Sequence, residues 1–110
     1  MITQNISVLE PQGRLDAIGA RPMETELAAR IAEGHVYLIV DLHNVRYISS
    51  NGLRVLLVAQ KNTQKQNGAL ALCGLSPRLL EIFEMAGFDR VFQIFQTREQ
   101  AQESMSQSNQ

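Results

Sequence analysis

The chain has little of what many binding and catalytic proteins depend on. It contains no tryptophan, two tyrosines and one cysteine among 110 residues. With so few aromatic rings, it lacks the stacking surface expected of a protein that binds bases or sugars. The single cysteine, Cys73, cannot form an internal disulfide, which favours an intracellular setting. We expect Cys73 to be buried as a small apolar side chain.

Strong charge and long apolar runs are also missing. The formal net charge is −1 and both signs are scattered, so no basic stripe indicates a nucleic-acid partner. No apolar run approaches the ~20 residues of a membrane span, and the polar first residues lack the features of a signal peptide. His35 and His43 are not spaced as metal ligands, and no glycine-rich phosphate loop is present. We therefore predict a cytoplasmic protein without metal or cofactor.

The apolar residues that are present alternate between strand and helix patterns. They make up 45% of the chain, enough for one domain with a single core. The expected strands are at about 6–10, 36–40, 69–73 and 91–95, with Leu15 continuing the first; the expected helices are at about 22–33, 50–67, 77–86 and from 97. This alternation predicts an α/β fold with a mixed, mainly parallel sheet of four to five strands and about four helices. The domain is expected to span 1–103, and residues 104–110 are expected to form a flexible polar tail.

The helix expected at 50–67 has two unlike halves. Its first half is apolar nearly all round and is expected to be wedged into the core. Residues 60–67 are almost wholly polar and are expected to project along the surface.

Two adjacent serines, Ser49 and Ser50, stand where this helix begins. Unpaired backbone N–H groups and the positive end of the helix dipole favour an anion at that position. Ser50 is therefore either an ordinary helix cap or a hydroxyl that receives a phosphate. It lies outside a Gly-x-Ser-x-Gly turn, and neither histidine is plausibly placed to act as its base. The sequence thus argues against an enzyme with a serine nucleophile.

The residues around these serines resemble the STAS family, and more narrowly its bacterial anti-sigma factor antagonists. The resemblance is carried by Asp41-Leu42, Val45, Ile48–Leu53 and Val55–Leu57, by Gly13–Asp16, and by Ser76–Phe88, and it covers about residues 5–103. In that family the phosphoacceptor is a serine two residues before the glycine of the motif, which implies Ser50 here. Many members have aspartate before that serine and serine or threonine after it. This chain has Ser49 and Asn51 there, so Ser49 is the second choice.

The resemblance implies a protein that switches partners. In the family, the unphosphorylated antagonist binds an anti-sigma factor, often itself a serine kinase with the fold of histidine-kinase-like ATPases, and so frees the sigma factor. Phosphorylation releases the antagonist, and a metal-dependent phosphatase resets the cycle. The alternative is a STAS adaptor subunit of a transport or signalling complex that is never phosphorylated.

Several residues near the serines have two readings each. Gly52 either weakens the helix without further significance or lets the backbone of a kinase or partner approach Ser50 closely. Arg54, one turn beyond Ser50, is either a partner contact or phosphate brace, or a solvated side chain. Asp16 and Asp41 follow strands, and either form an acidic rim that orients the Ser50 hydroxyl or cap their own loops.

An apolar surface on the third helix is the other candidate for partner binding. Leu80 and Met85 either form an exposed apolar patch there or belong to the edge of the core. The complete predicted partner-binding surface consists of Asp16, Ser49, Ser50, Asn51, Gly52, Arg54, Leu80 and Met85.

Overall fold

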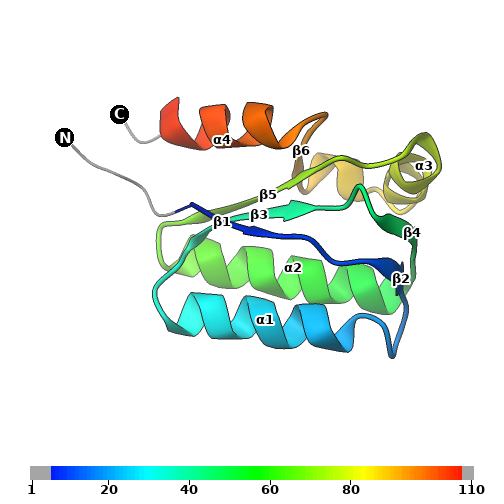
Figure 1. Cartoon of the computed structure of the whole chain (residues 1–110), viewed down its shortest axis with the longest axis horizontal. Coiled ribbons are helices and arrows are strands. Elements are labelled where there is room, and N and C mark those ends of the chain that lie inside the picture. Colours follow the sequence, from blue (N-terminus) through cyan, green and yellow to red (C-terminus); the bar gives the residue numbers. More distant parts are fainter. Residues whose placement is uncertain (1–5, 108–110) are drawn as a thin grey trace.

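Strands and helices alternate along the chain in the computed structural model, which describes residues 6–107 (Figure 1). The strands are β1 (Ile6–Leu9), β2 (Gly13–Leu15), β3 (Tyr37–Asp41), β4 (Val45–Ile48), β5 (Ala69–Cys73) and β6 (Gln93–Phe95). The helices are α1 (Arg21–Ala32), α2 (Ser50–Lys65), α3 (Pro77–Met85), α4 (Arg98–Gln107) and the short 3₁₀ helix η1 (Phe88–Arg90). None of the helices in this part of the chain is both long and apolar enough to cross a membrane.

The strands form two parallel ladders. Four strands make one sheet in the order β1-β3-β5-β6, and β2 pairs with β4 beside it. Every strand pairing among residues 6–107 is parallel. The predicted α/β class with a mainly parallel sheet is confirmed. The prediction missed β4 because its two buried residues, Val45 and Ile48, flank Arg46 and Tyr47 and do not alternate with them, so the segment was taken for a polar connection.

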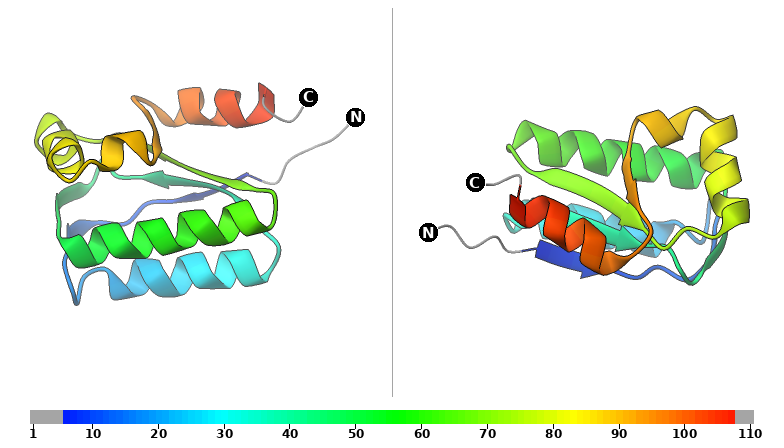
Figure 2. Two further views of the ribbon diagram at one scale, coloured as in Figure 1. Left: turned by 180° about the vertical axis from the view of Figure 1, so that it is seen from behind. Right: turned by 90° about the horizontal axis from the view of Figure 1, so that it is seen from above.

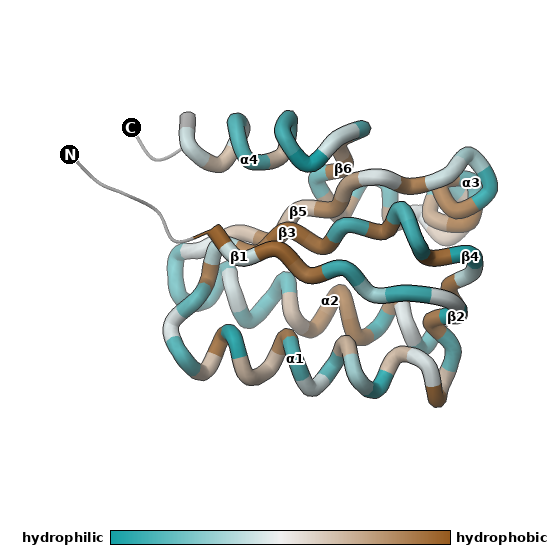
Figure 3. The backbone as a smooth tube through the Cα atoms, viewed as in Figure 1, coloured by the Kyte–Doolittle hydropathy of each residue, from teal (hydrophilic) through white to brown (hydrophobic). Residues whose placement is uncertain are grey.

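Helices cover both faces of the larger sheet (Figures 1 and 2). Helices α1 and α2 lie side by side on one face, α4 lies on the other, and α3 packs near the end of β4. The main core fills the space between the sheet and α1 and α2, and Figure 3 shows apolar stretches along β1 and β3 there. A smaller core lies under α4, where Ala101 and Met105 pack against Ile39, Ala71 and Cys73. Cys73 is buried as predicted, and this burial raises the pKa of its thiol to about 11.

Helix α4 continues beyond the expected end of the domain. It extends from Arg98 to Gln107, and Met105 is only 2% exposed. Residues 104–107 are therefore helical instead of a polar tail, because this one apolar side chain anchors the last turns to the sheet. The remaining tail residues, 108–110, and the polar first residues, 1–5, lie outside the described part of the chain.

The polar second half of α2 also differs from expectation. Gln60 and Thr63 are buried, although the sequence predicted a surface segment. The Gln60 side chain donates a hydrogen bond to the Val91 carbonyl at 2.7 Å, and the Thr63 hydroxyl donates to the Gln60 carbonyl at 2.7 Å. These bonds satisfy both polar groups, so burial is compatible with their chemistry.

Candidate functional site

The two serines at the start of α2 have different roles in the structure. Ser49 is the residue that caps the helix, with extended backbone angles. Its hydroxyl accepts a hydrogen bond from the Gly52 amide at 3.4 Å and donates one to the Leu15 carbonyl at 3.2 Å. Its own amide donates to the same carbonyl at 3.0 Å. The capping role considered for Ser50 therefore belongs to Ser49, which ties α2 to the end of β2.

Ser50 is the first residue of α2, and its side chain is exposed. Within residues 6–107 its hydroxyl makes no hydrogen bond. The first turn of α2 carries no acidic side chain. The hydroxyl therefore points into solvent at a helix start, where unpaired N–H groups favour negative charge.

Gly52 packs inward, against the end of β2. A Cβ atom at this position would lie 2.5 Å from the Leu15 carbonyl oxygen and 2.7 Å from Cγ1 of Ile48. Gly52 is also buried. A close approach of a partner's backbone at this glycine stays a prediction, because the contacts of the described residues concern only the inner side. The missing side chain of Gly52 lets the first turn of α2 press against the strands that precede it.

Asp16 caps its own loop, the second of its two readings. Its Oδ1 accepts a hydrogen bond from the Gly19 amide at 2.8 Å, and this bond is the main cause that lowers the pKa of Asp16 below its ordinary value. Its Oδ2 lies 3.8 Å from Nε of Arg14. The same loop carries Ile18, which is 75% exposed and was missed in the sequence although it is a large apolar residue among small and polar ones.

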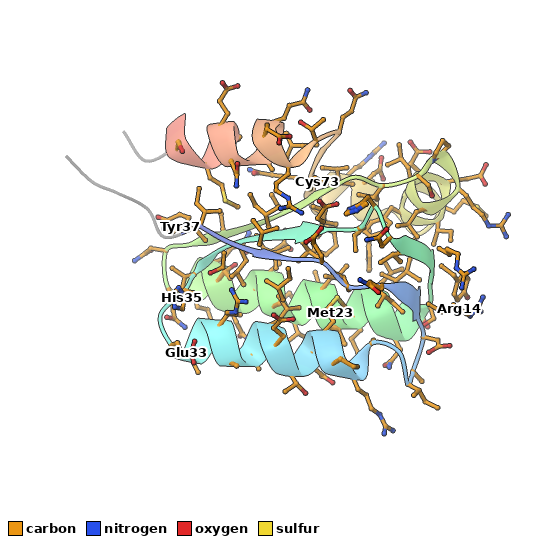
Figure 4. All side chains as sticks on the ribbon, viewed as in Figure 1. Arg14, Met23, Glu33, His35, Tyr37 and Cys73 are labelled. Carbon is orange, nitrogen blue, oxygen red and sulfur yellow. The ribbon has the colours of Figure 1, made fainter. Side chains whose placement is uncertain are left out.

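Exposed arginine side chains lie on β2, β4 and α2, the three elements that meet near Ser49. The Arg14 guanidinium lies over the Tyr47 ring, 4.5 Å from its centre, and Figure 4 shows Arg14 where β2 and β4 end. Arg46 of β4 and Arg54 of α2 are also exposed. Arg54 donates two hydrogen bonds to Oδ1 of Asn51, from Nε at 3.3 Å and from Nη2 at 3.0 Å. The predicted residues Asn51 and Arg54 thus form a pair within the first two turns of α2.

The two apolar residues of α3 lie apart from each other. Leu80 is half-buried and lines a groove of about 270 Å³, together with Leu75, Asp89, Ile94, Phe95 and Gln96. Met85 is 85% exposed at the end of α3 and does not line that groove. A partner contact at either residue stays a prediction.

Asp41 belongs to a different cluster, next to α4. It is 7% exposed. Its Oδ1 accepts two hydrogen bonds from His43, one from the backbone amide at 3.1 Å and one from ring Nδ1 at 2.8 Å. Its Oδ2 accepts from Nη2 of Arg98 at 3.0 Å, and the same nitrogen lies 2.7 Å from Oε2 of Glu10. The acidic rim predicted from Asp16 and Asp41 is therefore wrong, because both carboxylates are held by groups other than Ser50.

This cluster brings together possible metal ligands that the sequence spacing did not reveal. One ligand atom each of Glu10, Asp41 and His43 lie within 4.8 Å of one another. The signal was the position of both acids at strand ends, Glu10 directly after β1 and Asp41 as the last residue of β3, since neighbouring parallel strands end at the same edge. The Arg98 guanidinium already pairs with both carboxylates. This group of Glu10, Asp41, His43 and Arg98, named the Arg98 latch, holds the start of α4 against β1 and β3.

The Arg98 latch leads to a prediction for acid stability. Burial raises the pKa of Asp41, but hydrogen bonds from His43 and Arg98 outweigh it and leave the pKa below the ordinary 3.8. The ionised carboxylate therefore stabilises the fold above the unfolded-state pKa, and this contribution disappears as pH falls through the lower folded-state pKa. In Arg98→Gln the folded-state pKa is higher, so stability is expected to decline at a higher pH. Urea unfolding between about pH 3 and 6 measures this.

Arg54→Gln is the matched control for this measurement. Arg54 is an arginine on the surface whose bonded partner is the neutral Asn51 side chain. Arg54→Gln changes the net charge by the same amount as Arg98→Gln, but it leaves the hydrogen bonds of the Asp41 carboxylate intact. If the free energy of unfolding falls at the same pH in Arg98→Gln and Arg54→Gln, the Arg98 latch does not control the titration of Asp41.

The fold and the exposed serine define a small α/β domain that presents a hydroxyl at the start of a core-anchored helix. The STAS domain model matches residues 1–101, and the chain belongs to the STAS domain family. Among curated proteins, the chain is 40% identical over 90 residues to BtrV of Bordetella bronchiseptica, which is provisionally named an anti-sigma factor antagonist. The match covers 82% of this chain and 78% of BtrV. The anti-sigma-B factor antagonist of Listeria monocytogenes is 33% identical over 82 residues, covering 74% of this chain and 72% of that protein.

A solved structure extends the comparison to the fold. The unphosphorylated form of the anti-sigma factor antagonist SpoIIAA superposes with a TM-score of 0.70 at 17% identity, covering 99% of this chain and 94% of SpoIIAA. Its phosphorylated form, from Bacillus, gives 0.69 at 20% identity and covers 94% of each chain. These relatives are regulatory binding proteins by name, and the fold of this chain is shared with them.

Proposed function

We propose that this protein is an anti-sigma factor antagonist that switches partners when Ser50 is phosphorylated. The observation that carries the proposal is the contrast between the two serines: Ser49 is bonded on both sides, whereas Ser50 is exposed and its hydroxyl is unbonded within residues 6–107. A phosphate on Ser49 would break the cap and the bond to Leu15. A phosphate on Ser50 breaks no bond of the described structure, which supports Ser50 as the acceptor.

The arginines suggest which kind of partner surface the unphosphorylated form binds. Arg54 is exposed in the second turn of α2, and Arg14 and Arg46 are exposed on β2 and β4, the strands that adjoin the start of α2. A partner with an acidic docking face complements such a surface and is drawn to it. In the proposed cycle this partner is an anti-sigma factor that also acts as a serine kinase of the histidine-kinase-like ATPase fold. A metal-dependent serine phosphatase returns the protein to its binding form.

Phosphorylation is expected to change the surface and leave the fold intact. A phosphoserine adds about −1.5 to −2 charges at neutral pH. The residues behind Ser50 are fixed, because Gly52 packs against Leu15 and Leu53 lies in the main core. The added charge therefore acts on a rigid platform, where it opposes the acidic face of the partner.

The proposal is tested by adding phosphate and locating it. The protein is incubated with ATP and a candidate kinase encoded beside it, and its mass is measured. We expect a gain of one phosphate in the native protein and in Ser49→Ala, and none in Ser50→Ala. Ser49→Ala also loses its cap and about 1 kcal/mol of stability, so it is assayed where it remains folded. Phosphate on Ser49 would make Ser49 the acceptor and overturn the choice of Ser50. No phosphate with any such kinase would favour an adaptor subunit that is never phosphorylated.

A further inference from the structure

The pair formed by Asn51 and Arg54 lies beside the predicted phosphoacceptor. Arg54 is four residues after Ser50, a spacing that puts two side chains on the same face of a helix. Its guanidinium is held by two hydrogen bonds to the neutral amide oxygen of Asn51, the residue next to Ser50. The arginine is therefore already turned back toward the start of α2 before any phosphate is present.

We propose that Arg54 is an internal clamp for a phosphate on Ser50, and that it leaves Asn51 when the phosphate is added. This inference rests on the proposed function and assigns Arg54 a role in regulating the same site. The two bonds to Asn51 favour a role at the site over a purely solvated Arg54 side chain, because an arginine free in solvent would have no fixed partner.

Hydrogen-bond chemistry favours the exchange of partners. A guanidinium fits two phosphate oxygens at once, and it gains the attraction between opposite charges that a neutral amide cannot provide. The amide oxygen of Asn51 offers neither charge nor a second acceptor in that geometry. No acidic side chain in the first turn of α2 competes with the phosphate for Arg54.

A single phosphate on Ser50 changes the docking surface in two ways. The phosphate covers the Ser50 hydroxyl, and it also engages a cation that the unphosphorylated surface offers to an acidic partner. Release of the partner then depends on the loss of Arg54 as well as on the added negative charge.

The test uses phosphoserine incorporated genetically at position 50, so no kinase is needed. Phosphorus NMR follows the titration midpoint of the phosphate in the native background, in Arg54→Gln and in Arg54→Lys. A clamp stabilises the dianion, so the midpoint is expected about half a pH unit lower in the native background than in Arg54→Gln. The lysine variant is expected between them, because lysine keeps the charge but loses the two-pronged fit. Proton–nitrogen NMR of the arginine side chains is expected to show Nε–H of Arg54 shifting upon phosphorylation.

Arg90→Gln is the matched control, because it removes the same charge from an exposed position in η1, beside Val91, which bonds to Gln60 in the second half of α2. Equal midpoint shifts in Arg90→Gln and Arg54→Gln, or no shift in either, would overturn the clamp. The clamp and the proposed function fail separately. A kinase that never modifies Ser50 contradicts the function, whereas the midpoints measured on incorporated phosphoserine decide the clamp alone.

Discussion

Ser50→Asp is expected to weaken binding of the anti-sigma factor by about 30-fold or more, which corresponds to about 2 kcal/mol. The reason is electrostatic, because a carboxylate on the rigid start of α2 places negative charge against an acidic partner face. Folding is expected to be unaffected, because the Ser50 side chain is exposed and unbonded within residues 6–107 and an acidic group near a helix start is favourable. Calorimetry with the purified partner measures the affinity, and urea unfolding checks the stability.

Two further variants separate charge from other effects of this substitution. Ser50→Ala removes the hydroxyl without adding charge and is expected to bind within a few-fold of the native protein. Thr25→Asp places the same carboxylate at an exposed position of another helix, α1, and is expected to bind normally. Equal affinity for Ser50→Asp and the native protein would refute the switch. Equal weakening by Thr25→Asp would show that net charge alone matters.

Local sequence patterns predicted most elements of this fold because each depends on its own residues. Ser76 caps α3 through a bond to the Leu79 amide at 3.1 Å, and the left-handed Gly87 follows its end, as the sequence indicated. Thr97 likewise accepts a hydrogen bond from the Gln100 amide at 3.1 Å at the start of α4. Caps and stop signals of this kind act within a few residues and are therefore visible in a single sequence.

The errors concern contacts between segments far apart in the chain. Asp41 bonds to the distant Arg98 as well as to its neighbour His43, and Gly52 packs closely against Leu15. Neither long-range contact follows from a local rule. Strand β4 was missed for the same reason, since its four residues become a strand by pairing with β2. The candidate site was predicted as a set of residues, but the roles of Ser49, Gly52 and Asp41 depend on which segment packs against them.

Gly52→Ala is expected to destabilise the fold by about 2–3 kcal/mol. The added methyl group meets a backbone carbonyl at 2.5 Å and the Ile48 side chain at 2.7 Å, so α2 has to move away from the end of β2. That movement also strains the two bonds that Ser49 makes to the Leu15 carbonyl. Helix propensity acts in the opposite direction, since alanine favours a helix interior over glycine by about 1 kcal/mol. Urea unfolding at neutral pH measures the sum of these effects.

The same variant distinguishes the packing role of Gly52 from its predicted role in partner approach. If the glycine served to admit a partner's backbone, Gly52→Ala would keep or gain stability and lose affinity for the anti-sigma factor. Gln64→Ala, at an exposed position of the same helix, controls for substitution in α2 and is expected to unfold at nearly the native urea concentration. A stable Gly52→Ala would mean that α2 can shift without cost, and Ser50 would then not stand on a rigid platform. A destabilised Gly52→Ala instead means that one missing side chain fixes the serine in place.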